Sequence, residues 1–147
     1  MIAVILAGGS GTRFWPLSRR DRPKQLIRLF GDRVMIGQTV ERLAKVTSTD
    51  RILVVCGEHL IAPMRDALPE LDARNFLVEP AARNTAPAIA LAAAWAAHHY
   101  PGEPVGVFPS DHFIGAPDRS VDAVTRAGKA ALAGHLVTLG MQPDRPE

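Results

Sequence analysis

Short apolar runs of four to six residues recur along this chain, and segments with helical patterning separate most of them. The runs are apolar throughout rather than alternating, which is typical of strands that crossover helices bury on both faces. We therefore predict a doubly wound α/β fold with a mainly parallel sheet. The predicted strands cover residues 2–7, 51–56, 75–79, 105–108 and 136–141, and the predicted helices cover residues 36–46, 60–68, 85–100 and 121–132.

The composition favours a soluble chain with a core of its own. With 147 residues, 47% of them hydrophobic, residues 1–147 are expected to form a single domain. A lone cysteine, Cys56, excludes an internal disulfide framework and favours a reducing, cytoplasmic location. The first apolar run has no basic segment before it, unlike a signal peptide. The longest apolar stretch, residues 86–97, is too short to cross a bilayer, so we expect no membrane association.

The first predicted strand breaks into three glycines within four positions, Gly8, Gly9 and Gly11. Glycines let consecutive backbone N–H groups approach an anion without a Cβ in the way. The loop is not a P-loop, because no Gly-Lys pair follows at the required spacing. It is not the dinucleotide fingerprint either, because Phe14 stands where that motif needs its third glycine. The alternative is a Gly-rich hairpin turn, but no alternating strand follows. The pattern favours a triphosphate-binding loop.

Positive charge is concentrated just after these glycines. Although the net charge of the chain is only +2, residues 13–33 hold seven basic and two acidic residues, a local charge of +5. Such a confined patch fits a compact polyphosphate better than a long nucleic acid, so no nucleic-acid partner is expected. Arg13 and Lys24 are the candidate phosphate-binding residues within it.

Polar clusters follow three of the predicted strands. The glycine loop follows the first strand, residues 79–87 follow the third, and residues 109–112 follow the fourth. Ligands of parallel α/β sheets bind at the carboxyl ends of the strands, where these clusters are expected to meet. This convergence is stronger evidence for a nucleotide site than any one motif.

Several of these residues have a structural interpretation as well. Asp111 suits a Mg²⁺ ion shared with substrate phosphates, or a helix N-cap or turn. Glu79 could accept two hydrogen bonds from guanine, or form a salt bridge with Arg83 or another arginine. Asn84 and Thr85 could cap the next helix, contact a ligand, or do both.

Four motifs, taken together and in order, connect the chain to a known family: L-A-G-G-S-G-T-R-F-W-P-L-S-R, P-K-Q, E-P-A-A-R-N-T-A-P-A-I and P-S-D-H. With them, residues 2–147 closely resemble the mannose-1-phosphate guanylyltransferases (GDP-mannose pyrophosphorylases), a branch of the sugar-nucleotide nucleotidyltransferases. The glycine loop alone indicates only the superfamily. The Arg-Asn-Thr-Ala-Pro run after Glu79 points to the guanylyl branch.

The resemblance implies a Rossmann-like nucleotidyltransferase fold that transfers GMP from GTP to mannose 1-phosphate and releases pyrophosphate. It implies catalytic roles for Arg13 at the β- and γ-phosphates, Lys24 at the α-phosphate and Asp111 as the Mg²⁺ ligand. The nucleotide-contacting residues that it implies are Leu6, Ala7, Gly8, Gly9, Ser10, Gly11, Thr12, Glu79, Asn84, Thr85 and Ser110.

In the family, the sugar-contacting loops and a second metal-binding aspartate come after the segment that matches residues 146–147. We therefore expect this chain to carry the GTP–Mg²⁺ half, to be inactive alone, and to expose an apolar sheet edge for self-association or a partner. Two alternatives stay open: a non-catalytic nucleotide- or partner-binding module of the same fold, and a nucleotidyltransferase for another base or sugar.

Overall fold

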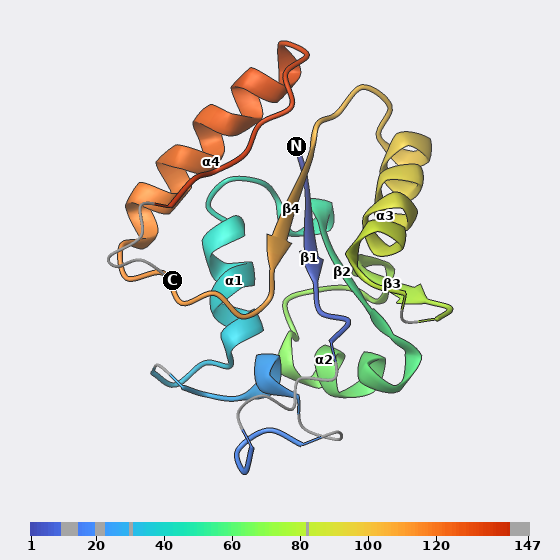
Figure 1. Ribbon diagram of the computed structural model, residues 1–147, viewed down its shortest axis with the longest axis vertical. Helices are drawn as coiled ribbons and strands as arrows, with labels where there is room; N and C mark the ends of the chain where they lie inside the picture. Colours follow the sequence, from blue (N-terminus) through green and yellow to red (C-terminus); the bar gives the residue numbers. More distant parts are fainter. Residues whose placement is uncertain (10–14, 20–22, 30, 82, 142–147) are drawn as a thin grey trace.

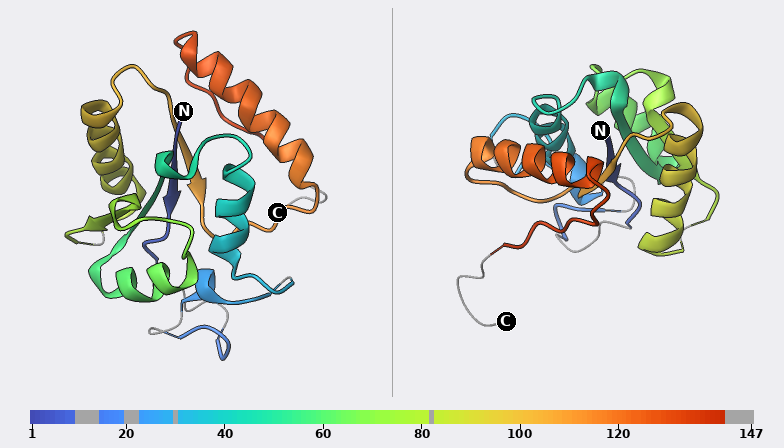
Figure 2. Two further views of the ribbon diagram at one scale, coloured as in Figure 1. Left: turned by 180° about the vertical axis from the view of Figure 1, so that it is seen from behind. Right: turned by 90° about the horizontal axis from the view of Figure 1, so that it is seen from above.

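The computed structural model describes residues 1–9, 15–19, 23–29, 31–81 and 83–141. The strands of these residues form one parallel sheet in the order β3-β2-β1-β4, with helices on both faces (Figures 1 and 2), which confirms the predicted α/β class. The strands are β1 (Ile2–Leu6), β2 (Ile52–Gly57), β3 (Phe76–Glu79) and β4 (Val105–Pro109). The helices are α1 (Met35–Leu43), α2 (Ile61–Ala67), α3 (Thr85–His99) and α4 (Pro117–Leu132), with short 3-10 helices η2 (Lys24–Leu26), η3 (Thr49–Arg51), η4 (Glu58–Leu60) and η5 (Ala73–Asn75).

The two central strands, β1 and β2, are almost fully buried because helices cover both of their faces. On one face, Ile5 and Val54 pack in a cluster with Ile36 of α1 and Met64 of α2. On the other face, alternate residues of the same strands pack against α3. Burial on both faces accounts for their continuous apolar sequences.

Helix α3 packs on the sheet through small side chains. Ala88, Ala92 and Ala96 recur every four residues and are buried, so the helix backbone lies close to the strands. The alanines of this segment thus form a packing stripe. Neither α3 nor any other helix among the described residues combines the length and the apolar character needed to cross a membrane.

The edge of the sheet at β4 departs from the prediction. β4 is only partly buried, and residues 136–141, predicted as a fifth strand, form neither helix nor strand. They follow α4 back along the molecule (Figure 1), with Leu136, Leu139 and Met141 exposed. Their apolar sequence suits a strand, but a strand also needs a hydrogen-bonded neighbour, and these residues have none among the described strands. Helix α4 begins earlier than predicted, at residue 117, where a proline is preorganised for the first turn.

The reactivity of the lone cysteine, Cys56, provides a test of the burial of β2. Cys56 is fully buried, and this burial, together with the nearby charge of Glu79, raises the pKa of its thiol to about 11. Since the thiolate is the reactive species, we expect the folded protein at pH 8 to resist an aromatic disulfide reagent that is followed by absorbance. In urea, the same reagent should release one equivalent of its chromophore per chain. Rapid stoichiometric labelling in native buffer would contradict this packing of β2.

Candidate functional site at the carboxyl edge of the sheet

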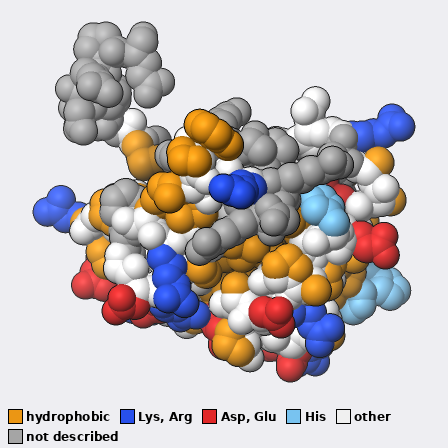
Figure 3. Space-filling model, turned by 90° about the horizontal axis from the view of Figure 1, so that it is seen from below, with side chains coloured by type: hydrophobic (Ala, Val, Ile, Leu, Met, Phe, Trp, Pro, Cys, Tyr) orange, Lys and Arg blue, Asp and Glu red, His pale blue; other side chains and the backbone are white. Residues whose placement is uncertain are grey.

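Strand register brings the predicted polar clusters to one edge of the sheet. Leu6, the last residue of β1, pairs with Val55 of β2 and with Pro109 of β4, and Gly57 of β2 pairs with Glu79. Figure 3 views the molecule from this edge, where basic, acidic and hydrophobic side chains all reach the surface. The segments after β1, β3 and β4 therefore start close together, as the sequence predicted.

Just beyond β1, the chain passes from the core to the surface within three residues. Leu6 is half-buried and Ala7 buried, while Gly8 and Gly9 are exposed. The Ala7 amide donates a hydrogen bond of 2.8 Å to the Val55 carbonyl and so extends the pairing of β1 with β2. The predicted site residues Ser10, Gly11, Thr12 and Arg13 lie outside the described residues.

Glu79 reaches across the end of β2 to the first glycine. A Cβ placed on Gly8 would collide with Oε2 of Glu79 and lie 3.4 Å from its Cδ. The carboxylate therefore lies directly over the Gly8 backbone, in space that a larger residue at position 8 would share with it. No salt bridge joins Glu79 to Arg83 in the described part of the chain. The predicted salt bridge with Arg83 is therefore absent, while Arg13, Arg20 and Arg22 lie outside the described residues.

Between β3 and α3, the chain makes a strained turn. Asn84 holds the N-cap position of α3 at φ 65° and ψ −170°, a conformation that costs a residue with a side chain of the order of 1–3 kcal/mol. Its side chain makes no capping hydrogen bond, so the predicted side-chain cap is absent here. The exposed Thr85 begins the helix, whose first backbone N–H groups have no partner within the helix.

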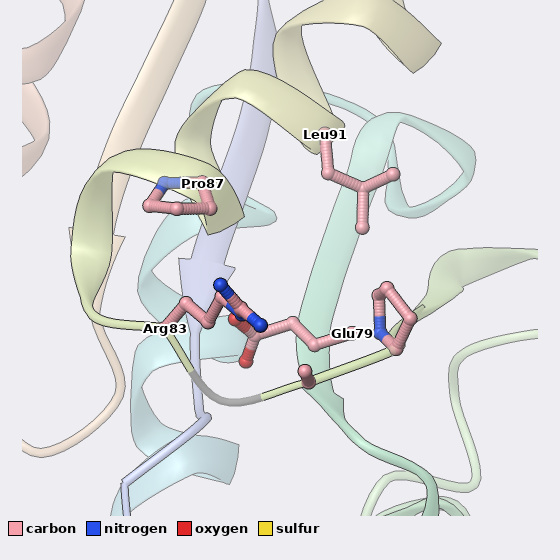
Figure 4. Close-up of a pocket in the computed structure, with 6 residues that line it drawn as sticks. Glu79, Arg83, Pro87 and Leu91 are labelled. Atoms are coloured by element: carbon pink, nitrogen blue, oxygen red, sulfur yellow. The ribbon is translucent and has the colours of Figure 1, made fainter.

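A small pocket adjoins this turn. It has a volume of about 200 Å³ and lies between the end of β3 and the first turns of α3 (Figure 4). Its lining is Glu79, Pro80, Ala81, Arg83, Pro87 and Leu91. One charged residue of each sign belongs to this lining, but the walls themselves are almost entirely apolar.

Lys24 and Asp111 form an ion pair across the site. Lys24 belongs to η2, and Asp111 follows β4 directly after the buried Ser110. Their side chains are 22% and 20% exposed, so the pair is half-buried. The N-cap interpretation of Asp111 is wrong, because α4 begins only at residue 117 and its N-cap is Ala116.

Gln25 belongs to the P-K-Q motif, but the sequence analysis assigned it no role. Its side chain is 1% exposed, and its amide donates a hydrogen bond of 2.8 Å to the Ala7 carbonyl. In a trans peptide the C=O and the following N–H point in opposite directions, so this bond also orients the Gly8 N–H. Its neighbour Leu26 is buried, so η2 is anchored on both the loop and the core. The sequence signal was a polar residue between Lys24 and an apolar run.

Metal ligands are sparse in the described residues. No three His, Cys, Asp or Glu side chains gather there as a metal site would require. Asp111 offers one carboxylate. This donor set fits a Mg²⁺ ion that takes most of its oxygen ligands from substrate phosphates and water, and does not fit a cage built by the protein.

Comparison with known proteins shows to which family the chain belongs. The nucleotidyl transferase family model matches residues 2–147. The chain belongs to the nucleotidyl transferase family. Mannose-1-phosphate guanylyltransferase of Escherichia coli K12 is 45% identical over 148 residues, which cover 98% of this chain and 31% of that protein. The xanthan biosynthesis protein XanB of Xanthomonas campestris is 42% identical over 149 residues, or 100% of this chain and 32% of that protein.

Solved structures of other proteins share the fold. A crystal structure described as mannose-1-phosphate geranyltransferase from Thermus thermophilus superposes with a TM-score of 0.88 at 38% identity, over 99% of this chain and 42% of that one. A structure described as mannose-6-phosphate isomerase from Helicobacter pylori gives 0.77 at 29% identity, over 99% of this chain and 51% of that one. This member of the nucleotidyl transferase family spans about a third of the length of the curated relatives that it matches.

Replacing Gln25 by leucine tests its anchoring role. We expect Gln25→Leu to lower the free energy of unfolding by about 1–3 kcal/mol, because the buried Ala7 carbonyl loses its donor. The Gly8 amide resonance should shift as well, since its peptide plane is released. Urea denaturation and ¹H–¹⁵N spectra measure the two effects.

Thr125→Val is the surface control. The Thr125 hydroxyl donates to the Val121 carbonyl at 2.8 Å in an exposed position, so its loss should change stability by less than about 0.5 kcal/mol. Equal stability losses in both variants, or an unmoved Gly8 resonance in Gln25→Leu, would rule out the anchor.

Proposed function

We propose that this chain forms the GTP-binding part of a mannose-1-phosphate guanylyltransferase. The supporting observation is the convergence, at one sheet edge, of the Gly8–Gly9 backbone, the Glu79 carboxylate and the Lys24–Asp111 pair. The identity to guanylyltransferases over the full length of the chain supports the same conclusion. Because those relatives are about three times longer, the complete activity is proposed for a protein that also has the remaining parts.

In the proposed reaction, a phosphate oxygen of mannose 1-phosphate attacks the α-phosphorus of GTP. A bond forms between that oxygen and the α-phosphorus. The bond between the α-phosphorus and the oxygen that bridges to the β-phosphate breaks, and pyrophosphate leaves. No covalent enzyme intermediate is needed. The protein accelerates the reaction by holding the groups in line and by neutralising the charge that develops on the phosphates.

The phosphates would lie along the glycine loop and the basic residues after it. Backbone N–H groups of Gly8, Gly9 and Gly11 would bind the triphosphate, with Ser10 and Thr12 in the same loop. Arg13 would hold the leaving β- and γ-phosphates, and Lys24 would neutralise the α-phosphate. Asp111, next to Ser110, would hold a Mg²⁺ ion, which supplies further positive charge against the phosphates when bound.

The nucleoside would lie between the ends of β1 and β3. Leu6 and Ala7 would border it, and Asn84 and Thr85 would face the base and ribose. Glu79 has its carboxylate over Gly8, where it could accept hydrogen bonds from the N1–H and the N2 amine of guanine. Adenine and the pyrimidines do not present this pair of donors, so Glu79 would select guanine.

Two substitutions separate the phosphate role from the base role. We expect Lys24→Ala to weaken binding of GTP, ATP and UTP alike by about 10- to 100-fold in Mg²⁺ buffer, because a charge-assisted contact is lost. Glu79→Gln should weaken GTP alone and so reduce its advantage over ATP about tenfold, because one acceptor becomes a donor. Calorimetric titration of each nucleotide measures both effects.

Lys45→Ala is the control for loss of a lysine charge. Lys45 follows α1 and forms a salt bridge with the exposed Asp118. It lies at the opposite end of β1 from the glycine loop, because the hydroxyl of the nearby Thr47 donates a hydrogen bond to the Met1 carbonyl. Its removal should leave nucleotide affinity unchanged. Undetectable binding of every nucleotide to folded protein would overturn the nucleotide site, and equal affinity for GTP and UTP would overturn the guanine assignment.

A second proposed role is association through the β4 edge. Val107 of β4 is 37% exposed, and Leu136, Leu139 and Met141 are 105%, 50% and 71% exposed. Exposed aliphatic side chains and a strand with only one hydrogen-bonded neighbour among the described strands both favour pairing with another chain. We propose a second copy as the partner, in keeping with a non-catalytic binding module of this fold.

Light scattering after size exclusion tests this association. We expect a mass that rises towards that of a dimer with protein concentration, and a monomer for the double substitution Leu136→Asp and Leu139→Asp. Replacing the exposed Arg126 and Lys129 of α4 by alanine serves as the surface control. A monomeric wild-type chain at high micromolar concentration would exclude the proposal.

A further inference from the structure

The Lys24–Asp111 ion pair joins two residues that need different partners in the proposed function, on which this inference rests. Lys24 would bind a phosphate, and Asp111 would hold the divalent cation. In this structure they form an ion pair with each other. In the described part of the chain, neither has another salt-bridge partner.

We propose that Lys24 masks the metal-binding carboxylate of Asp111 until the triphosphate draws the ammonium group away. The pair then works as a latch: the nucleotide opens the cation site, and the bound cation in turn keeps Lys24 free for the nucleotide. Nucleotide and metal bind interdependently as a result, and by linkage each raises the affinity for the other by the same factor.

The charges in the site explain why the nucleotide, and not the cation, would separate the two side chains. A divalent cation that approaches alone must displace an ammonium group of like sign from the carboxylate. Because both side chains are only about one-fifth exposed, solvent and salt screen this repulsion less than on an open surface. A triphosphate offers Lys24 several negative oxygens in exchange for one carboxylate. Asp111 is then left beside like charge, and a cation becomes its favoured partner.

The surrounding backbone is anchored, so the exchange needs only side-chain movement. Gln25 ties η2 to the Ala7 carbonyl, and the buried Leu26 ties it to the core. On the other side, Ser110 is buried at the end of β4, directly before Asp111. A lysine has enough rotatable bonds to leave the carboxylate while its Cα stays in place.

The first test uses Mn²⁺ alone, without nucleotide. The measured quantity is the Mn²⁺ concentration at which paramagnetic broadening of the amide signals of residues 110–112 is half-maximal. We expect this concentration to be about fivefold lower for Lys24→Met than for the wild-type chain. Lys24→Arg keeps the charge and Lys45→Met removes a lysine elsewhere, so both should match the wild type. Asp111→Asn should abolish the localised broadening. Equal broadening concentrations for Lys24→Met and wild type would overturn the latch.

The second test measures GTP affinity in excess EDTA. Asp111→Asn should tighten metal-free GTP about fivefold when Lys24 is present, because the ammonium group no longer has a competing partner. In the Lys24→Met background, the same substitution should tighten GTP binding distinctly less, because only the repulsion between Asp111 and the triphosphate is then relieved. With Mg²⁺ in excess, Asp111→Asn should instead weaken GTP binding. An equal gain in GTP affinity in both backgrounds would mean that Asp111 only repels the triphosphate, and it would overturn the latch.

The two tests separate this inference from the proposed function. If folded wild-type chain binds no nucleotide, the guanylyltransferase proposal fails, while the Mn²⁺ titration still decides whether Lys24 masks Asp111. If GTP binds in Mg²⁺ buffer but Lys24→Met leaves Mn²⁺ binding unchanged, the latch fails and the nucleotide site stands. Amide spectra of each variant establish that it is folded.

Discussion

The central position of β1, hydrogen-bonded in parallel to β2 on one side and β4 on the other, is the constraint on which this structure depends. Parallel pairing sends successive strands in the same direction, so their carboxyl ends meet at one edge. It also requires crossover connections, and the helices in these connections cover both faces of β1 and β2. The central strands can therefore be apolar throughout, and polar chemistry is confined to the residues that follow each strand.

At that edge, the site is organised by a few polar contacts rather than by a large cavity. Gln25 fixes the peptide before Gly8, Glu79 lies over Gly8, and Lys24 pairs with Asp111. Each contact joins segments far apart in the sequence. The strained backbone of Asn84 adds an exposed turn directly before α3. Together these features bring one ammonium group, two carboxylates and the Gly8 backbone to one edge of the sheet.

The edge of the sheet at β4 is only partly covered. The described residues leave β4 with one paired side and a half-exposed surface. The predicted strand at residues 136–141 illustrates the same point. Its composition is that of a strand, but hydrogen bonding to a neighbour, which no local sequence contains, decides whether a strand forms. The open edge and this unpaired segment expose apolar side chains together.

The sequence by itself determined the α/β class, the first four strands, the helices to within a few residues, and the strand ends at which the polar clusters lie. These follow from hydrophobic patterning and from glycine and proline, which act over a few residues. Tertiary structure decided what each side chain contacts. Asp111 does not cap a helix, because the next helix begins six residues later. Gln25 anchors the glycine loop, because its amide donates a hydrogen bond to a carbonyl eighteen residues away. Such contacts depend on how separate segments meet in space, which local pattern does not encode.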